Sequence, residues 1–267
     1  MEIVNERIDS GKAFDWGRIS NDYAKYRDVY PEEFYKRIVD RGLCVRGQKA
    51  LDLGTGTGVL PRNMYQYGAS WTAADISPEQ IEQARALAGS MNMNVNFLTV
   101  PTEQLKFPDA SFDVITACQC FWYFDPEKTA PLLSRLLKER GKLLILYMAW
   151  LPREDELAGR SEELVLKYNP KWSGAGEVRH PIDIPDAVCE RFELEYHEEF
   201  DCLIPFTRET WHGRMKACRG VGASLSGKEL TAWEEEHKKL LASIAPDSFD
   251  ILHYAAVAIL RKKTDEI

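Results

Sequence analysis

The sequence lacks a surplus of basic residues: its 34 lysines and arginines are outnumbered by 42 aspartates and glutamates, for a formal net charge of −8. Non-specific binding to nucleic acid depends on a basic surface, so this composition disfavours a nucleic-acid partner. Long apolar runs are also missing, and the longest one near the middle, 143–151, is far too short to cross a bilayer. Residues 1–14 contain neither an apolar run nor a small-residue cleavage site. We therefore expect a cytoplasmic protein that makes no membrane contact.

Cysteine is sparse, and none of the six cysteines forms a Cys-x-x-Cys pair. This absence removes the basic unit of zinc-ribbon and thioredoxin-like sites. A chain of 267 residues does not need disulfides to stabilise a core. We expect reduced thiols and no bound metal.

What the sequence does contain is the composition of a globular protein, with 45% hydrophobic and 28% charged residues, and we expect one domain over 1–267. Its central part alternates apolar strands with helices, which predicts a parallel sheet covered by helices, that is, a doubly wound α/β fold. The predicted strands are 49–53, 70–76, 94–100, 112–118 and 142–148, and the predicted helices are 61–68, 77–89 and 126–140.

After Trp150 the alternation stops. Residues 151–186 carry four prolines and three glycines and are predicted to be irregular. A short helix and a strand at 195–204 follow, then helical residues 207–245 and a last strand at 251–262. The ordered core is thus expected at about 40–150, 187–206 and 250–263. The remaining segments, called here the lid segments, are 1–39, 151–186 and 207–249.

A loop of three alternate glycines, Gly54, Gly56 and Gly58, follows the first predicted strand. Glycine permits positive φ and lets a ligand approach the backbone, and the helix beyond the loop offers free N–H groups. Asp75 ends the next strand, 21 residues after Gly54, where a carboxylate can accept hydrogen bonds from two ribose hydroxyls. The alternative is that Asp75 only caps the helix that starts near Ser77.

The spacing of this loop separates two kinds of cofactor. A dinucleotide site has Gly-x-Gly-x-x-Gly or Ala, whereas the sixth position from Gly54 is Val59. Asp52 lies two residues before the first glycine, and its carboxylate would repel a pyrophosphate but suits a cationic ligand such as a sulfonium with an ammonium group. An NAD-dependent oxidoreductase is kept as the alternative.

The motifs resemble those of class I S-adenosylmethionine-dependent methyltransferases, in particular the small-molecule enzymes of the type 11 group. The segments that carry the resemblance, in the right order over roughly 48–148, are Asp52–Gly58, Ala73–Ser77 with Ile81, Ala84 and Arg85, Phe107–Ile115, and Gly141–Ile145. The resemblance implies a Rossmann-like seven-stranded sheet whose last strand, at about 251–262, is antiparallel. It also implies helical lid insertions.

The resemblance further implies a binding site for S-adenosylmethionine and its product S-adenosylhomocysteine. Gly54, Gly56 and Gly58 would line the methionine and ribose, Asp52 would meet the ammonium, Asp75 would hold the ribose and Ile76 would pack on the adenine. The remaining contacts are assigned to Thr102 and Glu103 at the adenine edge and to Cys118 and Gln119 at the methionine end. Pro101 stands where the family often has an acid, so the sequence departs from the pattern at the adenine amine.

Methyl transfer from a sulfonium is an in-line displacement, so the protein has to orient the acceptor and exclude water. The sequence after the fourth strand lacks the Asn/Asp-Pro-Pro-aromatic motif of enzymes that methylate exocyclic amines. Its aromatic loop could instead wall a pocket for a small acceptor, or pack on the sheet. The candidates for acceptor binding are Trp122, Tyr123, Arg179, Trp211 and Arg214, and the candidates for a general base are His180, His212 and Tyr23.

Alternatives remain at this point. Any single lid residue can have a surface role instead of a site role. A non-catalytic protein that binds S-adenosylmethionine, or a protein or RNA methyltransferase, would share the same motifs. Cys118 and Cys120 alternate sides if the strand continues, which argues against the metalloid site of arsenite methyltransferases. We expect a monomer or a homodimer that acts on a small molecule.

Overall fold

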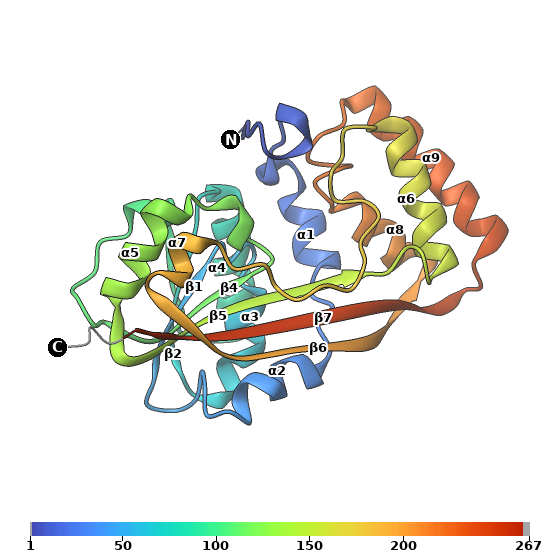
Figure 1. Cartoon of the computed structure of the whole chain (residues 1–267). Helices are drawn as coiled ribbons and strands as arrows, with labels where there is room; N and C mark the ends of the chain where they lie inside the picture. The colour runs from blue at the N-terminus through green and yellow to red at the C-terminus, as the bar shows by residue number, and fades with distance from the viewer. Residues whose placement is uncertain (1, 264–267) are drawn as a thin grey trace. The chain divides into compact units, whose positions relative to one another are not determined.

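The computed structural model describes residues 2–263 and contains a seven-stranded sheet in the order β3-β2-β1-β4-β5-β7-β6 (Figure 1). Neighbouring strands from β3 to β5 are parallel, and the last strand is antiparallel. The Rossmann-like α/β fold expected from the sequence is therefore confirmed. The strands are β1 (Lys49–Leu53), β2 (Ser70–Asp75), β3 (Asn96–Thr99), β4 (Phe112–Cys118), β5 (Leu137–Trp150), β6 (Phe192–Thr207) and β7 (Ser248–Lys262).

The helices largely alternate with these strands in the first half of the chain and gather in the second half. They are α1 (Ser20–Tyr26), α2 (Glu32–Val39), α3 (Val59–Met64), α4 (Pro78–Ser90), α5 (Pro126–Leu136), α6 (Glu156–Tyr168), α7 (Asp186–Cys189), α8 (Arg208–Lys216) and α9 (Gly227–Ile244). None of the helices within 2–263 is long and apolar enough to span a membrane.

Contacts divide the chain into two compact units. The sheet unit comprises Pro31–Met148, His180–Phe200 and the residues from Ala255 onward, and the helical unit comprises the residues up to Tyr30, Ala149–Arg179 and Asp201–Tyr254. Most of the predicted lid segments belong to the helical unit, except 31–39 and 180–186. Whether these segments close over a ligand stays a prediction, as does the single domain over 1–267. Met1 and residues 264–267 lie outside the described residues.

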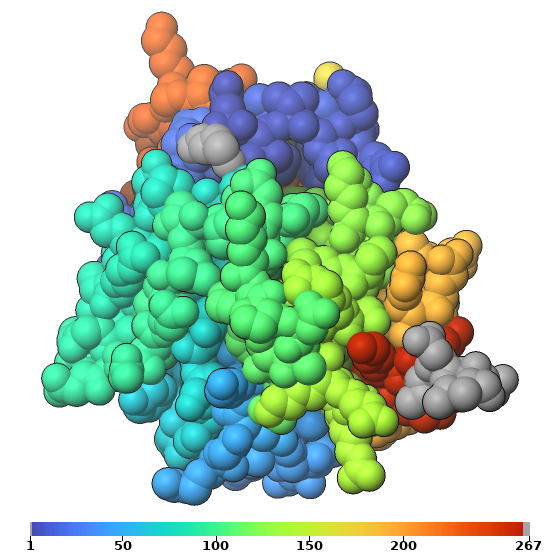
Figure 2. All heavy atoms as spheres, turned by 90° about the vertical axis from the view of Figure 1, so that its left-hand side faces the viewer, coloured from blue at the N-terminus to red at the C-terminus, as the bar shows by residue number. Residues whose placement is uncertain are grey.

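The core of the sheet unit follows from the apolar spacing of its elements. Four of the five residues of β1 are buried, as expected for a central parallel strand that is covered on both faces. On α4, Ile81, Ala84 and Ala88 recur at helical spacing and pack with Ala73 of β2 and Phe97 of β3. Segments between about 70 and 145 make up much of the face in Figure 2, in cyan to yellow-green.

The predicted helix 126–140 is wrong at its end, because α5 stops at Leu136 and β5 starts at Leu137. Leu137 pairs with Phe112, and the register then shifts so that Val114 pairs with Lys142. Lys138 lies in this irregular stretch and forms an ion pair with Asp113 at 2.8 Å. Strand pairing and burial of Leu137 thus override the helix propensity of the charged residues that follow it.

The prediction of an irregular 151–186 is also wrong, because α6 occupies part of it. The buried face of α6 includes Ala158, Ser161, Glu162 and Val165, which have helical spacing. Two of these four side chains are polar, so the apolar periodicity that identifies a helix is missing. The side chain of Asp155 accepts a hydrogen bond from the amide of Ala158 and was the available N-cap signal.

Other observed helix boundaries differ from the predicted ones by a few residues. The first crossover helix starts at Val59 instead of Pro61, and the predicted helical stretch 207–245 is two helices, α8 and α9. The predicted start of α4 is confirmed: Ser77 is the N-cap, and its side chain accepts from the amide of Gln80 at 3.3 Å.

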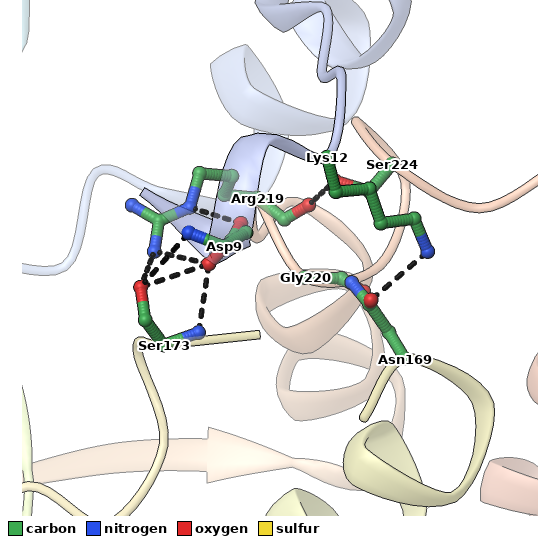
Figure 3. A network of polar contacts seen from close by, with 7 residues as sticks. All are labelled: Asp9, Lys12, Asn169, Ser173, Arg219, Gly220 and Ser224. Atoms are coloured by element: carbon green, nitrogen blue, oxygen red, sulfur yellow. Dashed lines mark hydrogen bonds and ion pairs between the residues drawn. The ribbon is translucent and has the colours of Figure 1, made fainter. Parts of the chain in front are cut away.

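The helical unit packs α8 against α1 and α9, and α6 against α9. Its N-terminal segment is held by Asp9, which is fully buried. Both oxygens of Asp9 are ion-paired with the guanidinium of Arg219, at 2.7 and 3.0 Å, and Ser173 donates its amide and hydroxyl to the same carboxylate (Figure 3). Nearby, Lys12 donates to Asn169 at 2.9 Å. Segments that are far apart in the sequence are thereby joined.

Candidate functional site

The glycine loop leaves β1 at the carboxyl edge of the parallel sheet, the edge at which open α/β sheets bind ligands. Gly54, Gly56 and Gly58 have φ values of +55°, +55° and +74°, in the left-handed region that side chains disfavour. A Cβ on Gly54 would lie 2.7 Å from the Cβ of Cys120, and one on Gly58 would lie 3.1 Å from the ring of Phe97. The loop therefore needs glycine for both its conformation and its close packing.

Asp75 connects this loop to the start of α4. Its Oδ2 accepts from the amide of Gly56 at 2.8 Å, and its Oδ1 accepts from the amide of Ser77 at 2.9 Å. Burial raises the pKa of Asp75, although these backbone donors favour the charged form. A carboxylate has about four acceptor positions, so acceptor capacity remains for a hydroxyl donor of a ligand. The side chain is thus both a support for the loop and a candidate ligand-binding group.

Asp52 is a buried carboxyl group under the same loop. Its side chain lies on β1, only 2% of the residue is exposed, and its Oδ1 accepts from the hydroxyl of Thr116 on β4 at 2.6 Å. Burial raises the pKa of Asp52 to about 7, against the opposing effect of the Thr116 hydrogen bond. An approaching cation would favour its ionised form, so the group is suited to a positively charged ligand.

The residues proposed for the adenine lie at the ends of the next strands. Ile76 follows β2 with 39% of its surface exposed, which leaves an apolar side chain available for stacking. Thr102 is buried in a short 3₁₀ turn after β3, and Glu103 is exposed in the same turn. A carboxylate oxygen of Glu103 accepts from the amide of Asp125 at 3.4 Å. These residues are thus close in sequence to the carboxyl ends of β2 and β3.

At the end of β4, the residue that contacts the glycine loop is Cys120, which the sequence did not predict for the site. Gln119 has a φ of +64°, and its side-chain amide donates to the carbonyl of Met148 on β5. This turn brings Cys120 over the loop, where its thiol donates to the carbonyl of Leu53 at 3.1 Å. Burial raises the pKa of Cys120 well above its ordinary value, which keeps the thiol neutral. Sequence reasoning proposed Cys118 and Gln119 here and missed Cys120, because a left-handed residue at Gln119 has no sequence signal.

The aromatic loop after β4 is partly exposed. Phe121 is buried, Tyr123 is half-buried and Trp122 is 39% exposed. The ring of Trp122 meets the ring of Tyr147 edge-on at 5.0 Å between centroids, and Tyr147 lies 6.0 Å from the ring of His180. The structure thus brings together two predicted site residues through Tyr147, which the sequence did not single out.

Two predicted residues of the helical unit belong to its core. Trp211 is fully buried, and its indole N–H donates to the hydroxyl of Ser161 at 2.9 Å, which disfavours a role in walling an acceptor pocket. His212 stacks on Trp233, and its Nδ1 lies 2.9 Å from Nδ1 of His237. Burial lowers the pKa of His212 to about 4. These contacts disfavour the proposed site roles of Trp211 and His212.

The other candidates of the helical unit lie in two settings. Arg179 is at the surface, where it forms ion pairs with Asp201 at 2.8 Å and with Glu154, so its charge is already matched. These ion pairs disfavour its proposed role in acceptor binding. Tyr23, by contrast, is half-buried, with the guanidinium of Arg27 4.6 Å from its ring centre. Arg214 is buried, and no carboxylate of residues 2–263 forms an ion pair with it.

Comparison with known proteins agrees with this arrangement. Residues 51–145 match the family model described as "Methyltransferase domain". The chain is 36% identical to a demethylmenaquinone methyltransferase of Thermus thermophilus over 114 residues, 42% of this chain and 52% of that one. It is 30% identical to a ubiquinone biosynthesis O-methyltransferase of Xanthomonas oryzae pv. oryzae over 135 residues, 50% of this chain and 56% of that one. Within 51–145 the chain is therefore similar to methyltransferase domains.

A solved structure supports the fold of the chain. A putative methyltransferase from Bacillus halodurans matches with a TM-score of 0.55 and 18% identity, covering 85% of this chain and 98% of that chain. The chain spans about half the length of the two curated relatives, and the matched family model lies inside the sheet unit.

No group of three or more His, Cys, Asp or Glu side chains within 2–263 is arranged to hold a metal ion. The six cysteines, all among residues 2–263, are free thiols in the structure.

Proposed function

We propose that this protein transfers a methyl group from S-adenosylmethionine to a small-molecule acceptor. The observation that carries the proposal is the loop from Gly54 to Gly58, with Asp75 bound to its backbone and Asp52 buried beneath it. The positive φ values leave a cradle that a Cβ would fill, which fits close approach of a ligand to the backbone. The two curated relatives carry the names of methyltransferases for quinones, which are small acceptors.

The cofactor would contribute an activated methyl group as its sulfonium. In the proposed site, Gly54, Gly56 and Gly58 line the methionine and ribose, and Asp52 pairs with the ammonium. Asp75 accepts hydrogen bonds from the ribose hydroxyls while it holds the loop. The adenine and methionine contacts proposed from the sequence, Ile76, Thr102, Glu103, Cys118 and Gln119, are kept, and Cys120 is added at the methionine end because it covers Gly54.

Acceptor binding is assigned in the sheet unit to the aromatic cluster of Trp122, Tyr123 and Tyr147. His180 lies at the same cluster and is the preferred candidate for a general base, with Tyr23 as the other. A base is needed only if the acceptor must lose a proton during in-line displacement. We further propose a cytoplasmic enzyme, a monomer or homodimer, that requires no metal and binds neither nucleic acid nor membrane.

The test is transfer of a labelled methyl group from S-adenosylmethionine to a panel of phenols, quinols, amines and small acids in excess chelator. We expect turnover of at least one small acceptor by the wild-type chain. Trp122→Ala should reduce that turnover, whereas the ion-paired Arg179→Ala should not. Methylation of only RNA or whole proteins would contradict the proposal.

A further inference from the structure

Arg214 is a buried cation without an anionic partner. It lies on α8 with 4% of its surface exposed, and its Nη1 lies 3.2 Å from the sulfur of Cys218. Its guanidinium sits 4.8 Å from the ring centre of Trp150, and its Nε has no hydrogen-bond partner. Within 2–263, no carboxylate forms an ion pair with this guanidinium. Burying a lone charge costs several kcal/mol, on the order of the net stability of a domain.

A second arginine lies beside it in the helical unit. Arg27 follows α1, has Tyr23 as its aromatic and hydrogen-bonding partner, and likewise forms no ion pair with a described carboxylate. The end of α1 packs directly on α8, because a Cβ on Gly213 would overlap the ring of Tyr26. The titratable groups that face Arg214 are Arg27, Cys218, Tyr30, Tyr23 and His253, none of them a carboxylate. Among the described residues, two cations therefore share one region without a carboxylate as counter-charge.

Arg219 provides the contrast within the same unit. The side chain of Arg219 is 14% exposed, and its Nε and Nη2 both donate to the buried carboxylate of Asp9 (Figure 3). Here a structural arginine has a carboxylate supplied by the fold. No described carboxylate compensates the charge of Arg214 in this way. An anion from outside the chain would therefore stabilise its buried guanidinium.

We propose that Arg214 and Arg27 bind an oxyanion, a carboxylate or a phosphate, of a small molecule at a site within the helical unit. This site lies outside the sheet unit that carries the proposed cofactor loop. Guanidinium groups bind these oxyanions through paired hydrogen bonds, and the faces of Trp150 and Tyr23 supply apolar walls next to them. Burial and the neighbouring Arg27 lower the pKa of Arg214 only to about 10, so it stays charged at neutral pH.

The test uses inorganic phosphate and benzoate as probes, each titrated into the whole protein against sodium chloride at equal ionic strength. We expect one of the two probes to raise the melting temperature saturably, by about 3 °C at a tenfold excess over its dissociation constant. The probe that binds identifies the oxyanion as a phosphate or a carboxylate. Arg214→Met should remove the shift, and Arg160→Met should retain it, because Arg160 is an exposed arginine of the same unit paired with Glu163.

Arg214→Met should also be at least as stable as wild type without the probe, since it removes an unpaired buried charge and keeps much of the volume. Arg27→Met, at a half-buried position, should remove the shift as well and serves if the first variant fails to fold. No shift with either probe, or an equal shift in the Arg214→Met and Arg27→Met variants, overturns the inference.

The cofactor also carries a carboxylate, which could be the anion that Arg214 binds. Measuring cofactor affinity separates this carboxylate from the oxyanion of another ligand. Arg214→Met should leave the affinity for S-adenosylhomocysteine within twofold of wild type. A loss of tenfold or more would assign the site to the cofactor and refute the inference. If the wild-type protein does not bind S-adenosylhomocysteine at all, the proposed function fails, whereas the anion titration still reports on Arg214.

Discussion

The backbone amide of Gly56 donates a hydrogen bond to Oδ2 of Asp75 at 2.8 Å, so the residue that ends β2 holds the loop that follows β1. The other oxygen of the same carboxylate accepts from the amide of Ser77. One side chain thus fixes the positions of both the glycine loop and the start of α4. A group with these contacts affects a ligand in two ways, through its own hydrogen bonds and through the loop.

Asp75→Ala should weaken binding of S-adenosylhomocysteine by about 1.5–3 kcal/mol, because it removes charged hydrogen bonds and leaves the loop amide without its acceptor. Titration calorimetry measures the change. The matched control is Ser77→Ala, which removes the helix cap and should cost about 1 kcal/mol of stability without changing the affinity. Equal affinities for Asp75→Ala and wild type would show that Asp75 serves only the fold.

Gly54→Ala should abolish detectable cofactor binding, since it adds strain at positive φ and places a Cβ 2.7 Å from Cys120. The double variant with Cys120→Gly should recover part of the loss, because the steric conflict disappears while the φ strain remains. Melting temperatures and calorimetry of the four proteins in this cycle give the coupling. A purely additive cycle would mean that Cys120 does not cover the loop in solution.

The raised pKa of Asp52 makes stability depend on pH. Because burial raises the folded pKa from 3.8 to about 7, its contribution is fully present below pH 4 and is lost as the pH rises through 7. The side chain of Asp52→Asn does not titrate. The melting temperature of this variant should therefore rise relative to that of wild type between pH 4 and pH 8. Calorimetry at several pH values tests this, with the exposed Asp109→Asn as control. A pH-independent difference would contradict the assignment.

The N-terminal segment should depend on the Asp9–Arg219 ion pair. Asp9→Ala leaves a largely buried guanidinium without its carboxylate, and we expect a loss of about 3 kcal/mol in the free energy of unfolding. Limited proteolysis should then cut before Tyr30 faster than in wild type. Added S-adenosylhomocysteine should slow this cutting if the lid segments close on the ligand. Equal cutting with and without the ligand would refute that closure.

The sheet and its glycine loop could be predicted from the sequence because their signals are local. The predicted first and fourth strands, 49–53 and 112–118, have the observed bounds, and Ser77 caps α4 as expected. Apolar runs, glycine spacing and a capping serine each report on a few neighbouring residues. The order of these elements predicted a parallel sheet covered by helices, and the resemblance of the motifs implied the seven-stranded Rossmann-like topology.

The rest depended on long-range contacts. Trp211 and His212 were proposed for the site because aromatic and basic residues gather there, but both are buried beside residues from distant segments, such as Ser161 and His237. The contact of Cys120 with the loop follows from the left-handed backbone at Gln119. Neither effect leaves a periodic pattern in the sequence.

The central claim is that the loop from Gly54 to Gly58 binds S-adenosylmethionine. Titration calorimetry of the wild-type chain with S-adenosylhomocysteine, in excess chelator at pH 7, tests it most directly. We predict one binding site per chain and no need for metal. Because the pKa of Asp52 is about 7, binding of the ligand's ammonium beside it should release about half a proton at pH 7. Titrations in two buffers with different ionisation enthalpies measure this release. Absence of binding heat in both buffers, together with an unchanged melting temperature at millimolar ligand, would contradict the claim.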